Sequence, residues 1–295
     1  MFDVDDHFSN YILPDKIHQV NFSFVVENHQ KTWGGTAGNQ AFYLSKLHLH
    51  PYILASGGYD FSDYLRFLKK LKVYTDFIDI KKNVPTGTGF VITDKKDNQI
   101  WMYSKGAMKN NTKLRIASLE KKLESLFAVI SPNDPQAIIN LVEECTREKI
   151  DFAFDPAFYI PTLPKETLLK GVSSAKIIFG NDYEIAFIQK KIGKKLTSFL
   201  NGKKIIVKTH GDQGSEIYEG SNMHKVGIYK TRTVDPTGAG DAYRAGFLYG
   251  FLQEYPARTC GQMGAVTASF AVEIKGTMNL TFTKKRFDKR LSELV

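Results

Sequence analysis

The sequence predicts an α/β fold in which a central, mainly parallel sheet is covered by helices on both faces. Three observations carry this prediction. From about residue 126 onward, short β-rich runs alternate with segments of helical periodicity, a pattern typical of a parallel sheet. An early β-rich run and a later hairpin break the alternation and predict a separate small sheet. The composition, 42% hydrophobic and 24% charged residues, is that of an ordinary globular protein.

The N-terminal third is expected to contain the small sheet and two helices. Met1–Pro14 shows no clear strand, whereas Ile17–Val26 alternates in polarity and is rich in β-formers, which predicts a strand. Thr86–Thr93 and Gln99–Ser104 are joined by a polar run with turn residues, which predicts a hairpin. The other elements expected here are a helix from the glycine pair at 34–35 to about Leu49, a strand at Tyr52–Ser56, a helix over Phe61–Leu71 and a strand within Val73–Ile80.

The remainder of the chain supplies the central sheet and its helices. The expected strands are Leu126–Ser131, Asp151–Asp155, Ala175–Phe179 and Lys204–Thr209, followed by a β-ribbon over Ser215–Lys230. The expected helices are Pro135–Glu148, Lys165–Lys170, Tyr183–Lys191, Leu196–Leu200 and three C-terminal helices near 238–254, 256–274 and 283–294. Ligands of such sheets bind beyond the carboxyl ends of the strands.

Charge and cysteine usage narrow the functional class. The net charge of +9 comes from lysine pairs spread along the chain, which favours a solvated surface over a nucleic-acid-binding face. Cys145 and Cys260 are far apart and have no metal-binding spacing, so reduced structural cysteines are expected. There is no signal-peptide pattern and no apolar run long enough to span a bilayer, so we expect no membrane partner and a cytoplasmic location.

A glycine-rich turn at 238–240 runs directly into an apolar helical segment. Backbone N–H groups at such a helix start lack partners and bind anions, so Gly238, Ala239 and Gly240 are candidates for an anion hole. Asp241 has two readings: it can cap the helix, or it can take a proton from an attacking hydroxyl beside a bound phosphate. Because capping leaves the flanking glycines unexplained, the chemical role is favoured.

The stretch D-P-T-G-A-G-D over 235–241 closely resembles the C-terminal signature of the ribokinase-like (PfkB) carbohydrate and nucleoside kinases. It is not a P-loop, because the chain contains no G-x-x-x-x-G-K-[ST] run. The resemblance implies a ribokinase-like three-layer fold over 1–295 as one kinase domain, with a small β-sheet lid formed by about 15–30 and 84–106. It also implies ATP, Mg²⁺ and Asp241 as the general base. In relatives a monovalent cation lies beside the matching D-P-T segment, which makes Asp235 and Thr237 candidates for K⁺.

A second motif, G-G-T-A-G-N-Q-A over 34–41, is similar to the substrate-side signature of the bacterial adenosine kinase branch. Taken alone, the glycine pair is an ordinary turn and Asn39 an ordinary cap. With the resemblance, Asn39 offers its amide to sugar hydroxyls. The residues that match substrate-side positions of the family are Ser23, Gly34, Gly35, Asn39 and Phe90.

Two further segments match nucleotide-side motifs. Asn181 and Glu184 follow a predicted strand; they form either a helix cap or, by resemblance to the family's N-x-x-E motif, part of the magnesium and phosphate site, with Glu184 acting mainly through water. Thr209, Gly211 and Gly214 either turn a hairpin or, like the family's T-x-G-x-x-G segment, border ATP.

Two departures from the family pattern stand out. Relatives begin with a strand of the form G-S-I-A-x-D whose aspartate holds the ribose, and this strand is expected to be missing before Met1, since neither Asp3 nor Asp5 fits its place. Where the adenosine kinase branch carries a glutamine pair, this chain has Phe158 and Tyr159, so stacking on a nucleobase is expected instead of amide hydrogen bonds.

These observations lead to one functional prediction with two alternatives. The prediction is ATP-dependent phosphorylation of the primary hydroxyl of a ribofuranosyl nucleoside, adenosine above all. The alternatives are a kinase of a free furanose sugar and a degenerate kinase fold kept as a ligand-binding or regulatory module. A homodimer through the lid sheet is a candidate assembly.

Overall fold

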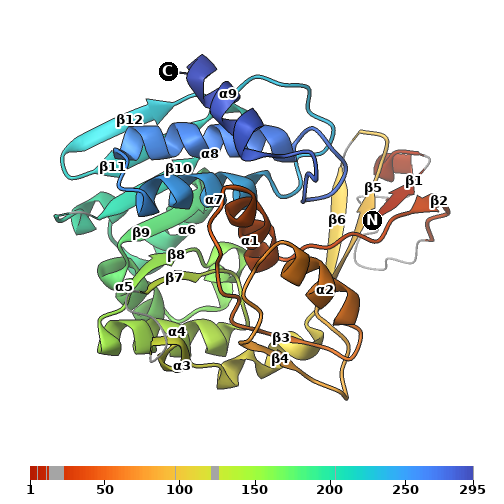
Figure 1. The fold of residues 1–295 in the computed structure, drawn as a ribbon, viewed down its shortest axis with the longest axis horizontal. Coiled ribbons are helices and arrows are strands. Elements are labelled where there is room, and N and C mark those ends of the chain that lie inside the picture. Colours follow the sequence, from red (N-terminus) through yellow and green to blue (C-terminus); the bar gives the residue numbers. More distant parts are fainter. Residues whose placement is uncertain are drawn as a thin grey trace.

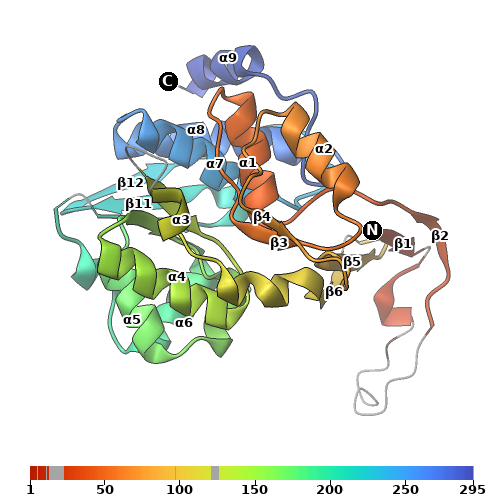
Figure 2. The same cartoon turned by 60° about the horizontal axis from the view of Figure 1, so that its bottom comes forward.

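The computed structural model describes residues 1–4, 6–10, 12, 23–96, 98–120, 126–202 and 204–294. Its middle layer is a sheet with the strand order β12-β11-β10-β9-β8-β7 (Figures 1 and 2). Strands β7 to β10 run parallel, and β11 and β12 add an antiparallel edge. The strands are β7 (Phe127–Ile130), β8 (Asp151–Phe154), β9 (Ile177–Asn181), β10 (Ile205–Thr209), β11 (Ser215–Glu219) and β12 (Asn222–Val226).

Alternating side chains of the central strands enter two different cores. In β9, Ile177 and Phe179 join one core while Ile178 joins the other, and all three are almost fully buried. Since successive side chains of a strand point to opposite faces, helices must cover the sheet on both sides. This explains why apolar β-rich runs in the sequence predicted a covered, mainly parallel sheet.

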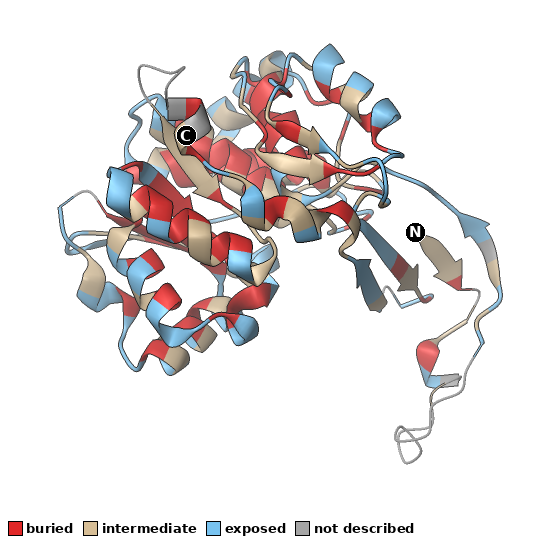
Figure 3. Cartoon of the chain, turned by 90° about the horizontal axis from the view of Figure 1, so that it is seen from below, coloured by how far each residue is buried: buried red, intermediate tan, exposed pale blue. Residues whose placement is uncertain are grey.

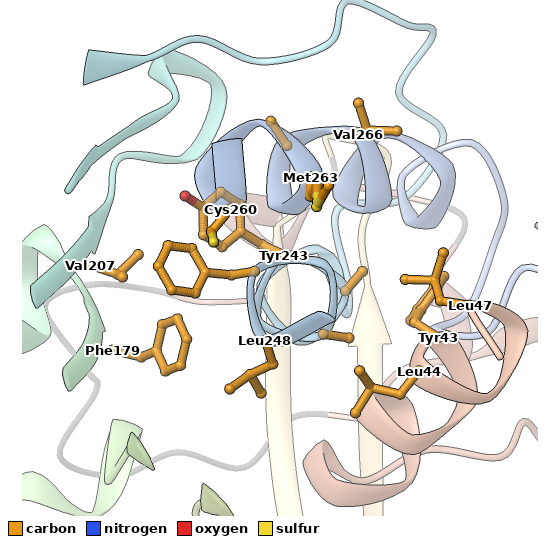
Figure 4. Close-up of a cluster of buried hydrophobic side chains, with 14 of the residues drawn as sticks. Tyr43, Leu44, Leu47, Phe179, Val207, Tyr243, Leu248, Cys260, Met263 and Val266 are labelled. Atoms are coloured by element: carbon orange, nitrogen blue, oxygen red, sulfur yellow. The ribbon is translucent and has the colours of Figure 1, made fainter. Parts of the chain in front are cut away.

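Each core is closed by its own group of helices. One face carries α4 (Pro135–Glu148), α5 (Lys165–Ser174) and α6 (Asp182–Ile192); the other carries α1 (Thr36–Lys46), α7 (Ala239–Leu252), α8 (Ala257–Ala271) and α9 (Lys284–Leu294). Figure 4 shows α7 between the sheet residues Phe179 and Val207 and residues such as Leu44 of α1. Because α7 is surrounded on several sides, its N-terminal turn is held rigidly.

A second, four-stranded sheet lies at the side of this body, and we call it the small sheet. Its order is β2-β1-β5-β6, formed by β1 (Phe2–Val4), β2 (Val26–His29), β5 (Thr88–Thr93) and β6 (Gln99–Ser104). Figure 3 shows many exposed positions along its strands. The hairpin β5–β6 was predicted.

The N-terminal prediction needs correction at two points. Phe2–Val4 does form a strand, pairing antiparallel with β2 and parallel with β5, although no strand was expected before Pro14. Of the strand predicted over Ile17–Val26, residues 17–22 lie outside the described part, as does Asp5. Residues 23–25 are irregular, and β2 begins only at Val26. Asp3 forms an ion pair with Lys275 (2.8 Å).

The elements between the two sheets complete the fold. β3 (Ala55–Gly57) and β4 (Ile78–Ile80) pair in parallel, and α2 (Ser62–Lys70) connects them. Among the described residues β3 pairs with β4 and not with β7, and both β3 and β7 border the same cleft. The short elements are η1 (Phe8–Asn10), η3 (Gly106–Lys113), α3 (Ala117–Glu120), η4 (Ala157–Thr162), η5 (Leu196–Phe199) and η6 (Gly211–Gln213).

Two further sequence observations can be set beside the structure. Cys145 and Cys260 are both buried and neither forms a disulfide. Among the helices of the described residues, none combines the length and the apolar character needed to cross a bilayer.

Candidate active site

The turn before α7 adopts a conformation that requires glycine. Gly238 is the N-cap residue of α7 and has φ = 81° and ψ = −1°, in the left-handed region. A Cβ atom built on Gly238 would lie only 2.8 Å from the Cβ of Thr277. Asp235 fixes the approach to this turn, since its two carboxylate oxygens accept hydrogen bonds from the N–H groups of Thr237 and Gly276, each at 2.9 Å. The sequence D-P-T-G therefore specifies a rigid turn at the start of α7.

This turn leaves some backbone donors without a hydrogen-bond partner among the described residues. The N–H groups of Gly238, Gly240 and Asp241 make no hydrogen bond to the described residues, whereas the N–H of Ala239 donates to the carbonyl of Pro236 (3.1 Å). The free donors are thus those of residues 238, 240 and 241 rather than the three of 238–240 that the sequence suggested. They lie at the positive end of a fourteen-residue helix, which favours a bound anion.

Asp241 is the third residue of α7, and its side chain does not cap the helix. Its carboxylate accepts a hydrogen bond from Nδ2 of Asn39 on α1 (2.6 Å), and Asn39 in turn accepts one from the hydroxyl of Thr277 (2.7 Å). Burial raises the pKa of Asp241, while the guanidinium of Arg244 and the hydrogen bond from Asn39 lower it. The carboxylate is therefore oriented and held where it can accept a proton.

The glycine pair before α1 places Asn39 opposite Asp241. Gly35 is the N-cap residue of α1 with φ = 84°, so Asn39 lies one turn inside the helix and the capping alternative for it is wrong. Gly38 is required because a Cβ there would lie 2.0 Å from the hydroxyl oxygen of Tyr64, which donates to the carbonyl of Gly34 (2.8 Å). Trp33 stacks on Tyr64 with ring centroids 4.9 Å apart, which anchors this segment.

A cleft of about 2010 Å³ opens beside Asp241. Its walls include several residues that the sequence singled out, namely Gly34, Gly35, Asn39, Phe90, Phe158, Tyr159, Gly238 and Asp241. Ser23 does not line the cleft; it is exposed in an irregular segment. The structure thus brings together all but one of the residues predicted on the substrate side.

One wall of the cleft is aromatic. Phe158, in η4 after β8, stacks on Tyr103 of β6 with centroids 5.4 Å apart, and Tyr103 stacks on Trp101 at 5.6 Å. Phe158 also contacts Tyr159 at 4.6 Å. About half of Phe158 and Tyr103 remains exposed to solvent, so their surfaces are available for stacking with a flat ligand. These contacts join the small sheet to the carboxyl end of β8.

Asn181 and Glu184 form a complete capping box at the start of α6. The side chain of Asn181 accepts from the N–H of Glu184, and the side chain of Glu184 accepts from the N–H of Asn181, both at 2.8 Å. The capping alternative is therefore correct in its geometry. One oxygen of Glu184 also lies 3.9 Å from Nη2 of Arg244, so this carboxylate reaches the first turns of α7.

Thr209, Gly211 and Gly214 lie where β10 turns into β11. Thr209 ends β10, and Gly211 and Gly214 have φ values of 59° and 91°. A Cβ on Gly214 would lie 2.2 Å from the carbonyl oxygen of Val226, so glycine is required there. The segment is a tight turn between antiparallel strands, and its residues, like Asn181 and Glu184, lie outside the cleft.

Comparisons with known proteins agree with this geometry. The family of "pfkB family carbohydrate kinase" proteins matches residues 9–284. The chain belongs to the PfkB family of carbohydrate kinases. Its members are phosphotransferases that act on hydroxyl groups, and the predicted ribokinase-like resemblance is confirmed.

Two relatives of this PfkB protein are informative. The nucleoside kinase of Methanocaldococcus jannaschii is 30% identical over 282 residues, which cover 95% of this chain and 92% of the relative. The crystal structure of that kinase superimposes with a TM-score of 0.85 at 28% identity, covering 99% and 94% of the two chains. The Burkholderia thailandensis nucleoside kinase in complex with ADP-inosine gives 0.86 at 25% identity, covering 99% and 92%.

The carboxylates near the anion-binding turn fit a magnesium ion that is bound mainly by the phosphates of the nucleotide. Within the described ranges, no group of three or more His, Cys, Asp or Glu side chains could hold a metal ion by itself. Mg²⁺ commonly binds through substrate phosphates, waters and one or two carboxylates, and Glu184 is a carboxylate near the anion-binding turn. For a monovalent cation, the relevant observation is that Oγ1 of Thr237 is buried and has no hydrogen-bond partner in the described chain.

Sequence reasoning missed four residues that the structure brings to this site. They are Arg244, Asp155, Thr277 and Tyr103. Arg244 carries a recognisable signal, because it is a cation within an otherwise apolar helical segment and thus indicates a buried ion pair. Thr277 contacts Asn39 across 238 positions of sequence, and no local pattern marks such a pair.

Proposed function

We propose that this kinase transfers the γ-phosphoryl group of ATP to the primary hydroxyl of a ribofuranosyl nucleoside, with adenosine as the first candidate. The observation that carries the proposal is the position of Asp241: its carboxylate borders both the free N–H groups of the α7 turn and a cleft with an aromatic wall. The nucleoside kinase relatives, and the ADP-inosine complex of one of them, support the choice of substrate class.

In this proposal Asp241 is the general base. The substrate hydroxyl lies against its carboxylate, which takes the proton as the oxygen attacks the phosphorus atom. The hydrogen bond from Asn39 leaves one carboxylate oxygen for the substrate. The N–H groups at residues 238, 240 and 241 stabilise the negative charge on the transferred group. Ala239 stabilises the turn but does not bind the phosphoryl group, because its N–H already donates to the carbonyl of Pro236.

In this proposal the nucleotide lies along the carboxyl ends of β9 and β10. Asn181 and Glu184 hold hydrated Mg²⁺, while Thr209, Gly211 and Gly214 border the nucleotide where the β10–β11 turn exposes its backbone. Mg²⁺, when bound, neutralises charge on the phosphates. Asp235 and Thr237 would hold a K⁺ ion, which would give the buried Thr237 hydroxyl a partner.

The aromatic wall favours a nucleoside over a free sugar. A free furanose offers hydroxyl groups, for which stacked rings provide no hydrogen bonds, whereas every nucleobase has a flat face. Tyr103 and Phe158 form an exposed aromatic surface in the cleft, and Tyr103 lies near enough to Asp241 to interact with its charge. Gly34, Gly35 and Asn39 border the sugar in this arrangement.

The direct experiment measures ADP release from MgATP in the presence of adenosine, inosine, guanosine, cytidine, ribose and fructose. We expect turnover with at least one nucleoside at a kcat/KM at least tenfold above that with either sugar. Turnover with ribose or fructose alone would instead support the sugar-kinase alternative. ATP hydrolysis independent of all acceptors would contradict both.

Phe158 and Tyr159 are expected to set the breadth of base selection. A site that binds a nucleobase through apolar contact and stacking distinguishes between bases by about tenfold to a few hundredfold in kcat/KM. A site that binds the base through hydrogen bonds rejects analogues far more sharply. The double variant Phe158→Gln and Tyr159→Gln should therefore narrow the set of accepted bases towards adenosine. The measurement is kcat/KM for adenosine, inosine, guanosine and cytidine in both proteins.

Tyr183→Gln is the matched control, because Tyr183 is an exposed aromatic residue that does not line the cleft. Its base preferences should equal those of the wild type. An equally strict adenosine preference in the wild type and the double variant would show that Phe158 and Tyr159 do not contact the base.

A further inference from the structure

Arg244 places a buried cation inside a helix that is otherwise almost entirely apolar. Its neighbours on α7, Tyr243, Ala245 and Phe247, are buried, and only 11% of the Arg244 side chain is exposed. Removing a guanidinium from water is costly unless carboxylates pair with it at good geometry. The chain therefore retains this charge at a specific place, three residues after Asp241.

The guanidinium is held by two carboxylates from different elements. Asp155, which directly follows β8, pairs with it through both carboxylate oxygens: Nη2 donates a hydrogen bond to Oδ1 at 2.9 Å, and Nε lies 2.6 Å from Oδ2 as an ion pair. Nη2 also lies 3.9 Å from Glu184 of α6. Burial raises the pKa of Asp155 to about 6, although Arg244 acts in the opposite direction. Arg244 thus connects α7 to the ends of two neighbouring strands.

The same guanidinium lies against the anion-binding turn. Long side chains of a helix lean towards its N-terminus, so Arg244 covers the turn that contains Gly240. A Cβ atom on Gly240 would lie 2.7 Å from Nη1 of Arg244, which shows how closely the two approach. Nη1 makes no hydrogen bond to the described residues; the guanidinium donates through Nη2 to Asp155, while its Nε makes only an ion-pair contact. The charge is therefore adjacent to both Asp241 and the free N–H groups.

Asp241 is influenced by groups from every element packed around it. These groups are Asn39 and Tyr43 on α1, Tyr64 on α2, Tyr103 on β6, Asp155 directly after β8 and Arg244 on its own helix, while Glu184 on α6 acts on Arg244 and Asp155. Arg244 is the positive charge in this set, and it faces the carboxylates of Asp155, Glu184 and Asp241. Without it, three like charges remain in a poorly solvated space, and the ionised form of Asp241 is disfavoured.

We propose that Arg244 is a positioning residue of phosphoryl transfer, which holds Glu184 beside the anion-binding turn and keeps Asp241 in the ionised form that accepts the proton. This inference rests on the proposed function of Asp241. A general base works only when it is ionised, so catalysis falls as the pH drops below the pKa of Asp241. Because removal of Arg244 raises that pKa, the acidic limb of the pH profile must move to higher pH.

The test compares Arg244→Met with Arg244→Lys. Arg244→Met removes the charge at similar length, and the midpoint of the acidic limb of kcat/KM should rise by about one pH unit or more. Arg244→Lys keeps the charge but loses the two-point contact with Asp155. The midpoint of its acidic limb should therefore stay closer to that of the wild type, while its kcat should be about tenfold lower. KM for the nucleoside should change less than kcat in both.

Arg290→Met is the matched control. Arg290 is also buried, with 14% of its side chain exposed, and it pairs with Glu273 at 2.6 Å, but it lies on α9 outside the cleft. Its loss should lower the thermal midpoint without moving the acidic limb. The comparison of Arg290→Met with Arg244→Met therefore separates the structural cost of losing a largely buried arginine from an effect on the pKa of Asp241.

A second readout needs no catalysis. Carbon-13 NMR of the ligand-free proteins follows the carboxyl signal of Asp241, assigned with Asp241→Asn, and its midpoint should move to higher pH in Arg244→Met. If Arg244→Met does not fold, the kcat of Arg244→Lys alone tests whether Arg244 is a positioning residue. An unchanged Asp241 titration in Arg244→Met, or an unchanged kcat in Arg244→Lys, overturns the proposal. A wild type that phosphorylates no nucleoside would instead refute the proposed function.

Discussion

Replacing Asp241 by asparagine is expected to lower kcat by about a hundredfold to ten-thousandfold, the usual effect of losing a general base. The side chains are nearly isosteric, and the new amide oxygen can still accept the hydrogen bond that Nδ2 of Asn39 now donates to Asp241 at 2.6 Å. The fold and the affinity for ATP should therefore persist. The loss follows from the missing proton acceptor rather than from an altered turn.

Asp63→Asn provides the control, because Asp63 is an exposed acid in the first turn of α2. Initial-rate kinetics with MgATP and the best nucleoside, together with the thermal midpoint and ATP binding by calorimetry, make the comparison. A near-normal kcat in Asp241→Asn would remove Asp241 from the reaction.

Gly238→Ala should be the most damaging single change to the anion-binding turn. A residue other than glycine in the left-handed region costs about 1–2 kcal/mol. At Gly238 the added Cβ would also lie 2.8 Å from the Cβ of Thr277, whose hydroxyl donates to Asn39. The substitution must displace either the turn or the Thr277–Asn39–Asp241 arrangement, so we expect a loss of at least about a hundredfold in kcat/KM.

Gly193→Ala separates the cost of backbone strain from the cost of the steric clash. Gly193 ends α6 with φ = 75°, close to the 81° of Gly238, but a Cβ there would meet no atom within 4 Å. Both variants should lose stability in thermal unfolding, while only Gly238→Ala should lose activity. Equal activity in the two variants would show that the turn at 238 does not support phosphoryl transfer.

The main sheet could be predicted closely from the sequence because its central strands β8, β9 and β10 are largely buried on both faces. Their apolar runs, such as the IIV that opens β10, have no polar interruption, and the observed strands differ from the predicted ones by at most two residues at either end. The helix Pro135–Glu148 was predicted with its observed bounds, because Asp134 and Pro135 form a strong start signal. Burial and local capping are both readable in the sequence.

The small sheet was predicted less well, for a physical reason. β1 has only three residues, too few for a periodicity, and it exists through pairing with β2 and β5, which are distant in sequence. The same limit applies to the site. The role of Asn39 was expected to be a contact with sugar hydroxyls, whereas its amide donates to Asp241, 202 positions away. Such long-range side-chain pairs become visible only in three dimensions.

The position of the phosphate in the product tests the central claim most directly. Wild-type protein is incubated with MgATP and adenosine, inosine or cytidine, and the product is analysed by phosphorus-31 NMR and mass spectrometry, with 5′-deoxyadenosine as the acceptor that lacks the primary hydroxyl. We predict a nucleoside 5′-monophosphate, lost in Asp241→Asn, and no product from 5′-deoxyadenosine. Phosphate on a ring hydroxyl, or product from 5′-deoxyadenosine, would contradict the account.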